Sequence, residues 1–296
     1  MRRMGDVLAG IHATWEFESD ALVIRFERGI RTPKLFQALG ERRVPHEALA
    51  SVTLAPGKRG TVVLHAVPRP GADPLMEAAA GQLKEACDPY RLVLPADREA
   101  LAGRCRDELL ARVEAAAPGA LDPFGAYDEG VASTDRFLVA APRGPLSFKA
   151  YDGRASFDGN AEVAFRWSWT GASSEKWKAG DRSFSVRDLC GVEWCSPDVP
   201  DGHLRLLRRG GEPRAGRPDQ DPDTVVFGLG YGPVHESLPF AAAVLAAIRS
   251  TDRTPARVAA PGAVAERIRH LGELHQAGLV TDEEFSAKKA ELLAEL

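Results

Sequence analysis

The sequence predicts an α+β protein in which two tandem antiparallel β-rich domains, each capped by a C-terminal helix, precede an αα-hairpin. Three observations predict this fold. Residues 8–31 and 146–170 both show period-two alternation on either side of a tight turn, the pattern of a β-hairpin. Apolar positions in the two halves correspond at one constant spacing. Residues 263–296 have the caps and apolar spacing of two short helices.

The constant spacing is the strongest sign of an internal repeat. Four apolar positions of the first half reappear 140 residues later: Val44, Leu49, Val52 and Leu54 correspond to Phe184, Leu189, Val192 and Trp194. One offset held across an irregular spacing is harder to obtain by chance than alternation alone. Further along, 61–64 is matched with 203–206, and 90–94 with 224–227. The halves are therefore expected to superpose as two copies of one domain.

Each half ends in a predicted helix. Apolar residues three and four positions apart predict one helix over about 96–114 and a second over about 239–248. We expect Leu101 and Phe240 to be buried against the sheet of their own half. The first half also inserts a helix near 74–86, where Asp73 can cap the N-terminus and Pro74 suits the first helical position.

Pro, Gly and acidic residues mark two linkers. The predicted boundaries are 5–116 for the first repeat, 117–134 for a linker, 135–250 for the second repeat, 251–262 for a second linker and 263–296 for the hairpin.

The C-terminal segment has the sharpest local pattern. Gly278 can end one helix, Thr281 can cap the next with Glu284 three residues later, and Phe285 completes a hydrophobic staple. This LxxLxxxGxxTxxEFxxKKxxLL spacing resembles the SHOCT (short C-terminal) domain. The resemblance implies oligomerisation or partner contact, without enzymatic activity. The residues expected to make that contact are Leu271, Leu274, Leu279, Phe285 and Leu292.

The two halves resemble a tandem bacterial family, domain of unknown function 4429, that often precedes a SHOCT module. The resemblance is carried by residues 15–17, 43–52 and 88–92. The second half departs from it, with Ser185 where Pro45 falls, so the repeats need not share a ligand. The order of strands, hairpin and final helix is also similar to pleckstrin-homology-like domains, which bind lipids, peptides or proteins.

Composition excludes several classes of protein. The chain has 296 residues, 44% hydrophobic content and a net charge of -4, which exclude wholesale disorder and argue against a globally basic nucleic-acid binder. No apolar run has the roughly 18 to 20 residues of a membrane-spanning helix. The four cysteines form no CxxC pair and no signal peptide is recognised, so we expect a cytoplasmic protein.

No motif predicts catalysis, and neither a cofactor nor a metal site is expected. Walker, GxSxG and HExxH sequences are absent. The glycines of 228–232 are followed by Pro233, which favours a turn over a phosphate loop. Cys190 is interpreted as a core residue and Trp167 as part of the core face. Trp177 is the tryptophan expected to be partly exposed, with stacking on nucleobases as the alternative role of such tryptophans.

Positive charge is concentrated in residues 28–70, which hold eight basic and two acidic side chains. Solvated loops and a surface for an anionic partner are both open interpretations. Among anionic partners we rank an acidic protein segment first, because residues 261–296 carry four basic and seven acidic groups. The candidate binding residues are Arg28, Arg31, Lys34, Arg42, Arg43, Lys58 and Arg59.

These patterns favour a non-catalytic interaction protein, with tandem partner-binding domains and a tail for oligomerisation or docking. Two alternatives remain open: an enzyme whose site is assembled from scattered residues, and a binding module for an anionic ligand such as nucleic acid or lipid.

Overall fold

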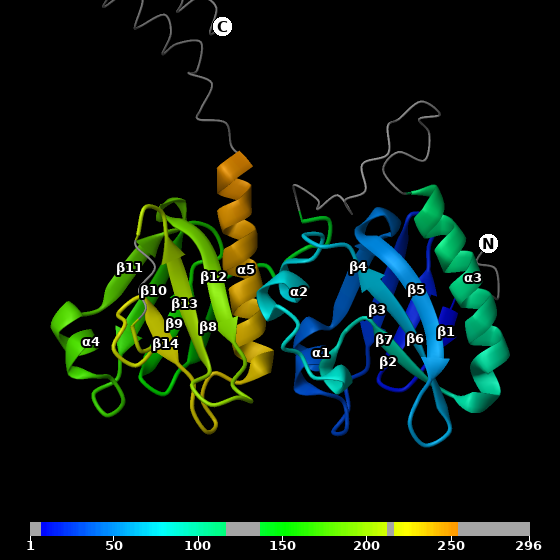
Figure 1. Cartoon of the computed structure of the whole chain (residues 1–296), viewed down its shortest axis with the longest axis horizontal. Coiled ribbons are helices and arrows are strands. Elements are labelled where there is room, and N and C mark those ends of the chain that lie inside the picture. Colours follow the sequence, from blue (N-terminus) through cyan, green and yellow to red (C-terminus); the bar gives the residue numbers. More distant parts are fainter. Residues whose placement is uncertain (1–6, 117–136, 212–215, 254–296) are drawn as a thin grey trace, which may run out of the picture. The chain divides into compact units, whose positions relative to one another are not determined.

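The computed structural model describes residues 7–116, 137–211 and 216–253. Two β-rich repeats follow each other along the chain (Figure 1). Both belong to one compact unit that ends at Arg249. The predicted C-terminal hairpin lies outside the described residues. None of the described helices is long and apolar enough to cross a membrane.

The first repeat has a four-stranded and a three-stranded antiparallel sheet. The strands are β1 (Val7–Ala9), β2 (Ala13–Phe17), β3 (Ala21–Phe26) and β4 (Glu41–Pro45), then β5 (Leu49–Pro56), β6 (Thr61–Pro68) and β7 (Arg91–Pro95). Its α-helices are α1 (Lys34–Leu39), α2 (Pro74–Ala79) and α3 (Glu99–Ala115). Single 3-10 turns occupy His46–Ala48, Glu85–Cys87 and Ala96–Arg98.

The second repeat has the same two sheets with the same strand order. The strands are β8 (Leu146–Lys149), β9 (Gly153–Phe157), β10 (Glu162–Trp167) and β11 (Arg182–Ser185), then β12 (Leu189–Cys195), β13 (His203–Arg208) and β14 (Thr224–Val226). Its helices are α4 (Ser174–Ala179) and α5 (Val234–Arg253), with a 3-10 turn over Val186–Asp188. The α+β class predicted from the sequence is confirmed, whereas the likeness to pleckstrin-homology domains stays a prediction.

The offset of 140 residues extends to irregular features of the sheets. The β5–β6 ladder shifts register between Leu49 and Ser51, and the β12–β13 ladder shifts between Leu189 and Gly191. Leu49 lies opposite Pro68 as Leu189 lies opposite Arg208. The match of 61–64 with 203–206 was therefore wrong by two residues, because strand pairing keeps the offset at 140. Alternation alone cannot distinguish shifts of two positions.

The second register shift also corrects the expectation for Cys190. This cysteine lies at the irregularity between Leu189 and Gly191, and its side chain is exposed. A β-bulge adds one residue to a strand and breaks the alternation of faces. Counting back by twos from Trp194 and Val192 therefore assigned Cys190 to the wrong face.

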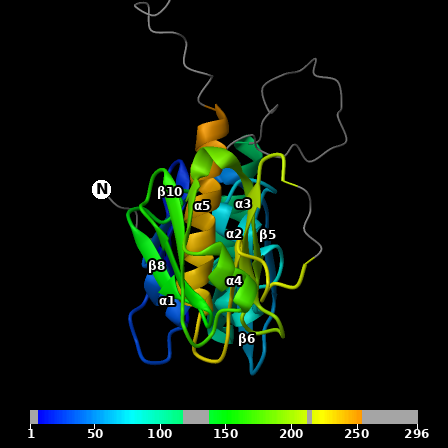
Figure 2. The same cartoon turned by 90° about the vertical axis from the view of Figure 1, so that its left-hand side faces the viewer.

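The closing helices cover the apolar faces of the sheets. Phe240 of α5 is 1% exposed, as expected, and packs with Phe148 and Phe157 in the core of the second repeat. Figure 2 shows α5 running alongside the strands of this repeat. On α3 the buried stripe consists of Ala102, Cys105, Leu109 and Val113. Leu101 is only half-buried because it lies at the margin of that stripe.

Two helix boundaries differ from expectation. The structure begins α5 at Val234, and Pro239 lies inside the helix. Proline removes one backbone donor, and burial of its neighbours Leu238 and Phe240 favours continuation of the helix in spite of that loss. The helix expected near 74–86 is limited to α2, because Ala80 adopts a left-handed conformation with φ of 46°. Asp73 caps α2 as predicted, accepting a hydrogen bond from the Leu75 amide at 2.9 Å.

Helix α2 has no counterpart in the second repeat and instead packs against it. Leu75, Ala78 and Ala79 belong to the hydrophobic core of the second repeat. The Gln82 side chain donates to the Trp194 carbonyl at 3.0 Å and accepts from the Ser196 amide at 2.9 Å. The insertion therefore joins the two repeats through apolar contacts and paired backbone groups.

Candidate interaction surfaces

The loop between the third strand and the first helix occupies equivalent positions in the two repeats. It is the β3–α1 loop (27–33) in the first repeat and the β10–α4 loop (168–173) in the second. Helices α1 and α4 begin 140 residues apart, at Lys34 and Ser174. Each loop lies beside the short helix that it precedes (Figure 1). The two loops can therefore be compared, although the β3–α1 loop is one residue longer than the β10–α4 loop.

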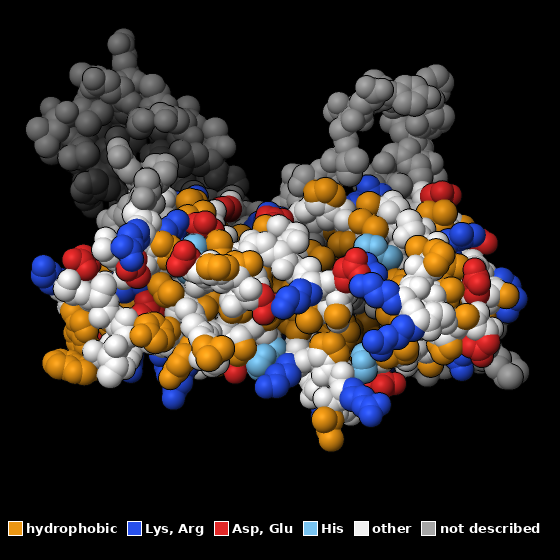
Figure 3. All heavy atoms as spheres, turned by 60° about the horizontal axis from the view of Figure 1, so that its bottom comes forward, with side chains coloured by type: hydrophobic (Ala, Val, Ile, Leu, Met, Phe, Trp, Pro, Cys, Tyr) orange, Lys and Arg blue, Asp and Glu red, His pale blue; other side chains and the backbone are white. Residues whose placement is uncertain are grey.

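The second repeat exposes a group of aromatic side chains around this loop. Trp169 is 84% exposed and Trp177 is 43% exposed, and their rings meet edge to face with centroids 5.4 Å apart. Hydrophobic side chains gather at the lower left of Figure 3, at the end of the second repeat. We call this group the aromatic surface; its members are Tyr151, Trp169, Trp177, Leu229 and Tyr231.

Backbone contacts bring the segments of the aromatic surface together. The Tyr151 amide donates to the Val226 carbonyl at 2.9 Å, and the Ser168 amide donates to the Asp152 carbonyl at 2.8 Å. A Cβ on Gly171 would lie 2.2 Å from the carbonyl oxygen of Tyr151, so only glycine allows this approach. Tyr151 also meets Tyr231, with ring centroids 6.2 Å apart. The segments that carry the two ring pairs are therefore adjacent.

A buried ion pair fixes α4 beneath the aromatic surface. The Lys176 Nζ donates to Asp152 Oδ2 at 2.5 Å, and to the carbonyls of Pro218 and Thr224 at 2.9 Å and 2.7 Å. All three ammonium donors are used. Burial lowers the pKa of Lys176, whereas the nearby Asp152 carboxylate raises it; burial raises the pKa of Asp152. Trp177 is therefore adjacent to a residue that is held in place.

The first repeat has no such surface at the equivalent positions. Ile11 and Gln37 stand where the second repeat has Tyr151 and Trp177, and the β3–α1 loop contains no aromatic residue. Its loop is basic instead. Within the described part of the chain, none of the five exposed cations of the β3–α1 loop, the first position of α1 and the β5–β6 turn has an ion-pair partner: Arg28, Arg31, Lys34, Lys58 and Arg59. The β3–α1 loop and the β5–β6 turn that carry these cations lie at the lower end of this repeat in Figure 1.

The seven cations predicted as one binding edge do not form one. Arg42 is buried and donates to Asp73 Oδ1 at 2.7 Å, while the Tyr90 hydroxyl donates to Asp73 Oδ2 at 2.8 Å. Arg42 lies two positions before Val44 on β4, so both side chains point to the same face of the sheet, which is the core face. Arg43 is paired with Glu18 and Asp20 at the β2–β3 turn, which is the opposite end of β3 from the basic loop.

The exposure of the tryptophans also refines the sequence analysis. Trp167 is 9% exposed and Trp177 is partly exposed, as expected. The expectation that Trp177 is the one exposed tryptophan was wrong: Trp169 is more exposed than Trp177, because β10 ends at Trp167 and the alternation stops there. The 228–232 segment forms a turn closed by a bridge between Gly228 and Tyr231, as predicted.

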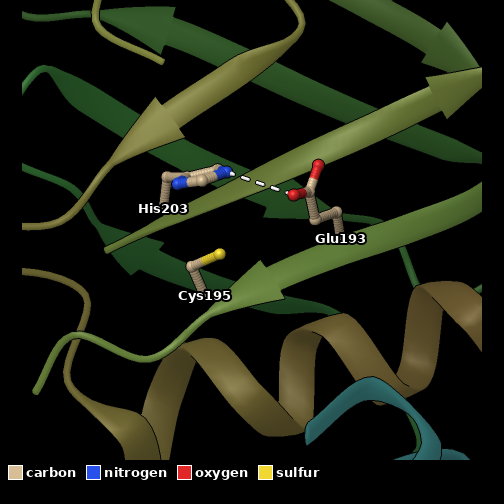
Figure 4. A group of neighbouring side chains, drawn as sticks. All are labelled: Glu193, Cys195 and His203. Atoms are coloured by element: carbon tan, nitrogen blue, oxygen red, sulfur yellow. Dashed lines mark ion pairs between the residues drawn. The ribbon is translucent and has the colours of Figure 1, made fainter. Parts of the chain in front are cut away.

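One group of described residues could hold a metal ion, and the sequence analysis missed it. The ligand atoms of Glu193, Cys195 and His203 all lie within 4.8 Å of one another (Figure 4). Burial and the Glu193 carboxylate raise the pKa of the Cys195 thiol, whereas Arg205 lowers it. The residues come from two strands, with spacings that match no metal motif. Only the strand register brings them together.

Comparison with known families accounts for most of the chain. A family model described as domain of unknown function (DUF4429) matches residues 15–110 and 155–245, which follow the two repeats. A second model, the short C-terminal domain (SHOCT), matches residues 266–293. No curated protein matches the chain. Since the two DUF4429 segments cover more than half of its length, the chain belongs to the DUF4429 family.

Proposed function

We propose that this chain is a non-catalytic interaction protein that self-associates, the SHOCT segment of one copy binding the aromatic surface of another. The observation that carries the proposal is the exposure of Trp169 and Trp177 on the second repeat. In the first repeat the β3–α1 loop has no aromatic residue, and Gln37 stands at the position of Trp177. The fold therefore does not require these tryptophans.

The chemistry of the aromatic surface suits a protein partner. Contiguous exposed apolar side chains are unusual on a monomer and commonly mark interaction sites. Tyrosine and tryptophan are enriched among the residues that dominate binding energy. Because Lys176 is bonded on three sides, α4 presents Trp177 with little ordering cost when a partner binds.

The SHOCT segment has the complementary chemistry. A segment of about 35 residues is too small to bury its own apolar residues well, so it needs a second surface. Its seven acidic and four basic groups give residues 261–296 a net negative charge. The exposed residues Lys149 and Lys178 flank the aromatic surface: Lys178 follows Trp177, and the Lys149 carbonyl accepts from the Gly232 amide at 2.7 Å. Apolar contact and charge thus favour the same pairing.

The length of the linker favours binding between copies. Tyr231 lies three residues before α5, whose 20 residues span about 30 Å. The nine residues 254–262 reach at most about 30 Å when fully extended. To bind the aromatic surface of its own chain, the SHOCT segment would need this linker to be fully extended. Binding to another copy does not require a fully extended linker.

A second candidate function rests on the five exposed cations of the β3–α1 loop, the start of α1 and the β5–β6 turn. Arg25, Arg42 and Arg43 are all ion-paired, whereas the five exposed cations named above have no partner among the described residues. We propose, as the alternative, that these cations bind the acidic residues of the SHOCT segment. Because exposed charges are screened by salt, this contact would weaken strongly between 0.05 M and 0.5 M salt. Apolar contact with the tryptophans would not weaken over this range of salt.

Light scattering on the full chain tests both candidates. At tens of micromolar we expect an oligomer that becomes a monomer when the chain is cut after Ala259, and in the double variant Trp169→Ser/Trp177→Ser. The control is Ile30→Ser, which changes a fully exposed apolar residue in the β3–α1 loop of the first repeat. A monomeric full chain would overturn self-association. A double variant that stays oligomeric while the truncated chain dissociates would overturn the role of the aromatic surface, and salt-induced dissociation would then favour the basic loop.

A further inference from the structure

The ladder between β12 and β13 determines where Glu193, Cys195 and His203 lie. Cys195 is directly opposite His203, and Glu193 is opposite Arg205. Alternation places Glu193 and Cys195 on one face of β12, while the intervening Trp194 is buried and its indole N–H donates to Ser237 of α5 at 3.0 Å. The three side chains therefore lie on the face of the sheet that α5 does not cover. Figure 4 shows them pointing toward one another.

The hydrogen bond of His203 determines which ring nitrogen is free to bind a ligand. Nδ1 lies 2.7 Å from the carbonyl oxygen of Asp201, which can only accept, so Nδ1 carries the proton. In the neutral ring Nε2 then has a lone pair. His203 is 7% exposed, and its Nε2 is buried without a hydrogen-bond partner. A histidine whose Nδ1–H is held by a carbonyl while Nε2 is unpartnered has the arrangement of a metal ligand.

The unpartnered nitrogen faces two further donor atoms. Nε2 is 3.8 Å from Glu193 Oε1, too far for a hydrogen bond, and the Cys195 sulfur completes a group within 4.8 Å. Four-coordinate zinc holds nitrogen and oxygen at about 2.0–2.2 Å and sulfur at about 2.3 Å, so its ligand atoms lie about 3.5 Å apart. Glu193 is 42% exposed at its side chain and has room to make that small closing movement.

Arg205 orients the carboxylate of Glu193. Its Nη1 donates to Glu193 Oε2 at 2.9 Å and its Nε donates to Asp221 Oδ2 at 3.1 Å. Glu193 Oε2 is therefore occupied, and Oε1 is the oxygen on the side of His203. Second partners of this kind fix the orientation of metal ligands and strengthen binding.

We propose that Glu193, Cys195 and His203 bind a divalent transition-metal ion of the zinc type, with a fourth coordination position left for water or a partner. Imidazole and thiolate ligands favour such ions over magnesium or calcium. At the equivalent positions the first repeat has Thr53, Ala55 and Val63, which supply no comparable set of ligands. The site would thus belong to the second repeat alone and lies outside the aromatic surface.

Cobalt(II) titration of the reduced, metal-free full chain, made without a histidine tag, tests the site. We expect one equivalent to bind with d–d absorption in the visible and thiolate-to-cobalt charge transfer in the near ultraviolet, both displaced by zinc. Cys195→Ser should abolish the charge-transfer band, and His203→Gln should weaken binding at least tenfold. The controls are Cys190→Ser, an exposed cysteine on the same strand, and His235→Gln, a histidine on α5.

Two readouts keep the test decisive if a variant folds poorly. Zinc should raise the thermal unfolding midpoint of the unaltered chain and of Cys190→Ser, but not that of Cys195→Ser. Absence of stoichiometric cobalt binding by the unaltered chain would overturn the proposal, and His203 would then be interpreted as a partner of Glu193 only. Charge transfer that survives Cys195→Ser but disappears in Cys190→Ser would assign the thiolate to another site and would also overturn it.

Discussion

The two repeats share their strand order, their register shifts and the position of their short helix, but their buried charges are held differently. In the first repeat Arg42 pairs with Asp73, the residue that caps the inserted helix α2. In the second repeat Lys176 pairs with Asp152 and with two carbonyls. The two buried cations thus lie at different positions of the common fold, and each is accompanied by a carboxylate.

The two buried networks differ in how completely their donors are satisfied. Every ammonium proton of Lys176 has an acceptor, whereas the Nε of Arg42 is buried without one. The Arg42 guanidinium instead lies 6.0 Å from the centre of the Tyr90 ring. Burial and the Asp73 carboxylate raise the pKa of Tyr90 well above its ordinary value, so its hydroxyl stays protonated and donates to Asp73. Asp73 is therefore the centre of the first network.

Removing each carboxylate should reveal this difference. Asp152→Ala would leave Lys176 buried without a counter-ion and is expected to cost about 3–5 kcal/mol in the free energy of unfolding. Asp73→Ala has the same effect on Arg42 and also removes the N-cap of α2, worth about 1 kcal/mol more. Urea unfolding measures both. The exposed Asp107→Ala on α3 is the control and should change stability by less than about 0.5 kcal/mol.

The same unfolding curves test how strongly the repeats are coupled. Since α2 packs against the second core, Asp73→Ala should lower a single cooperative transition. Two separate transitions, with only one shifted, would show that the repeats unfold independently and would contradict the stabilising role assigned to the α2 contacts.

The closing helices offer a second comparison. Phe240→Ala removes a ring that is 1% exposed and should cost about 3–5 kcal/mol. Leu109→Ala, at a fully buried position of α3, should cost about 2–5 kcal/mol. Leu101→Ala should cost less than Leu109→Ala, because Leu101 lies at the margin of the buried stripe of α3. Thermal and urea unfolding of the three variants give the order, and equal losses at Leu101 and Leu109 would contradict it.

Sequence patterns predicted the repeat because the offset of 140 survives through β4, β5 and β6 and at the bulge, although β3 corresponds to β10 at 141 and β7 to β14 at 133. They could not place Cys190, since a bulge is a property of two strands and is invisible in one. Arg42 is the opposite case. Its alternation with Val44 favours a buried side chain, whereas its charge favours an exposed one, and the expectation followed the charge. The group of Glu193, Cys195 and His203 could not be predicted without the β12–β13 register, because neither strand alone supplies the three ligands.

The smallest expected effects concern the turns that join the second and third strands. In the first repeat Arg43 donates to both oxygens of Asp20 at 2.8 Å, and this contact lowers the pKa of Asp20. In the second repeat Asp158 accepts from the amides of Asn160, Ala161 and Glu162 at 2.8 to 3.0 Å, and these bonds lower its pKa. One turn thus depends on a side-chain cation and the other on backbone donors.

Salt should separate these two turns. A carboxyl group with a lowered pKa in the folded chain stabilises it above the unfolded pKa of about 3.9, and the stabilisation is lost as pH falls through the folded pKa. Raising the salt from 0.1 M to 1 M shortens the Debye length from about 10 Å to about 3 Å. The pKa of Asp20, followed by NMR titration, should therefore rise toward its ordinary value, while that of Asp158 should change little, because its short backbone hydrogen bonds remain. Equal shifts at both residues would show that the two turns are held by the same kind of interaction.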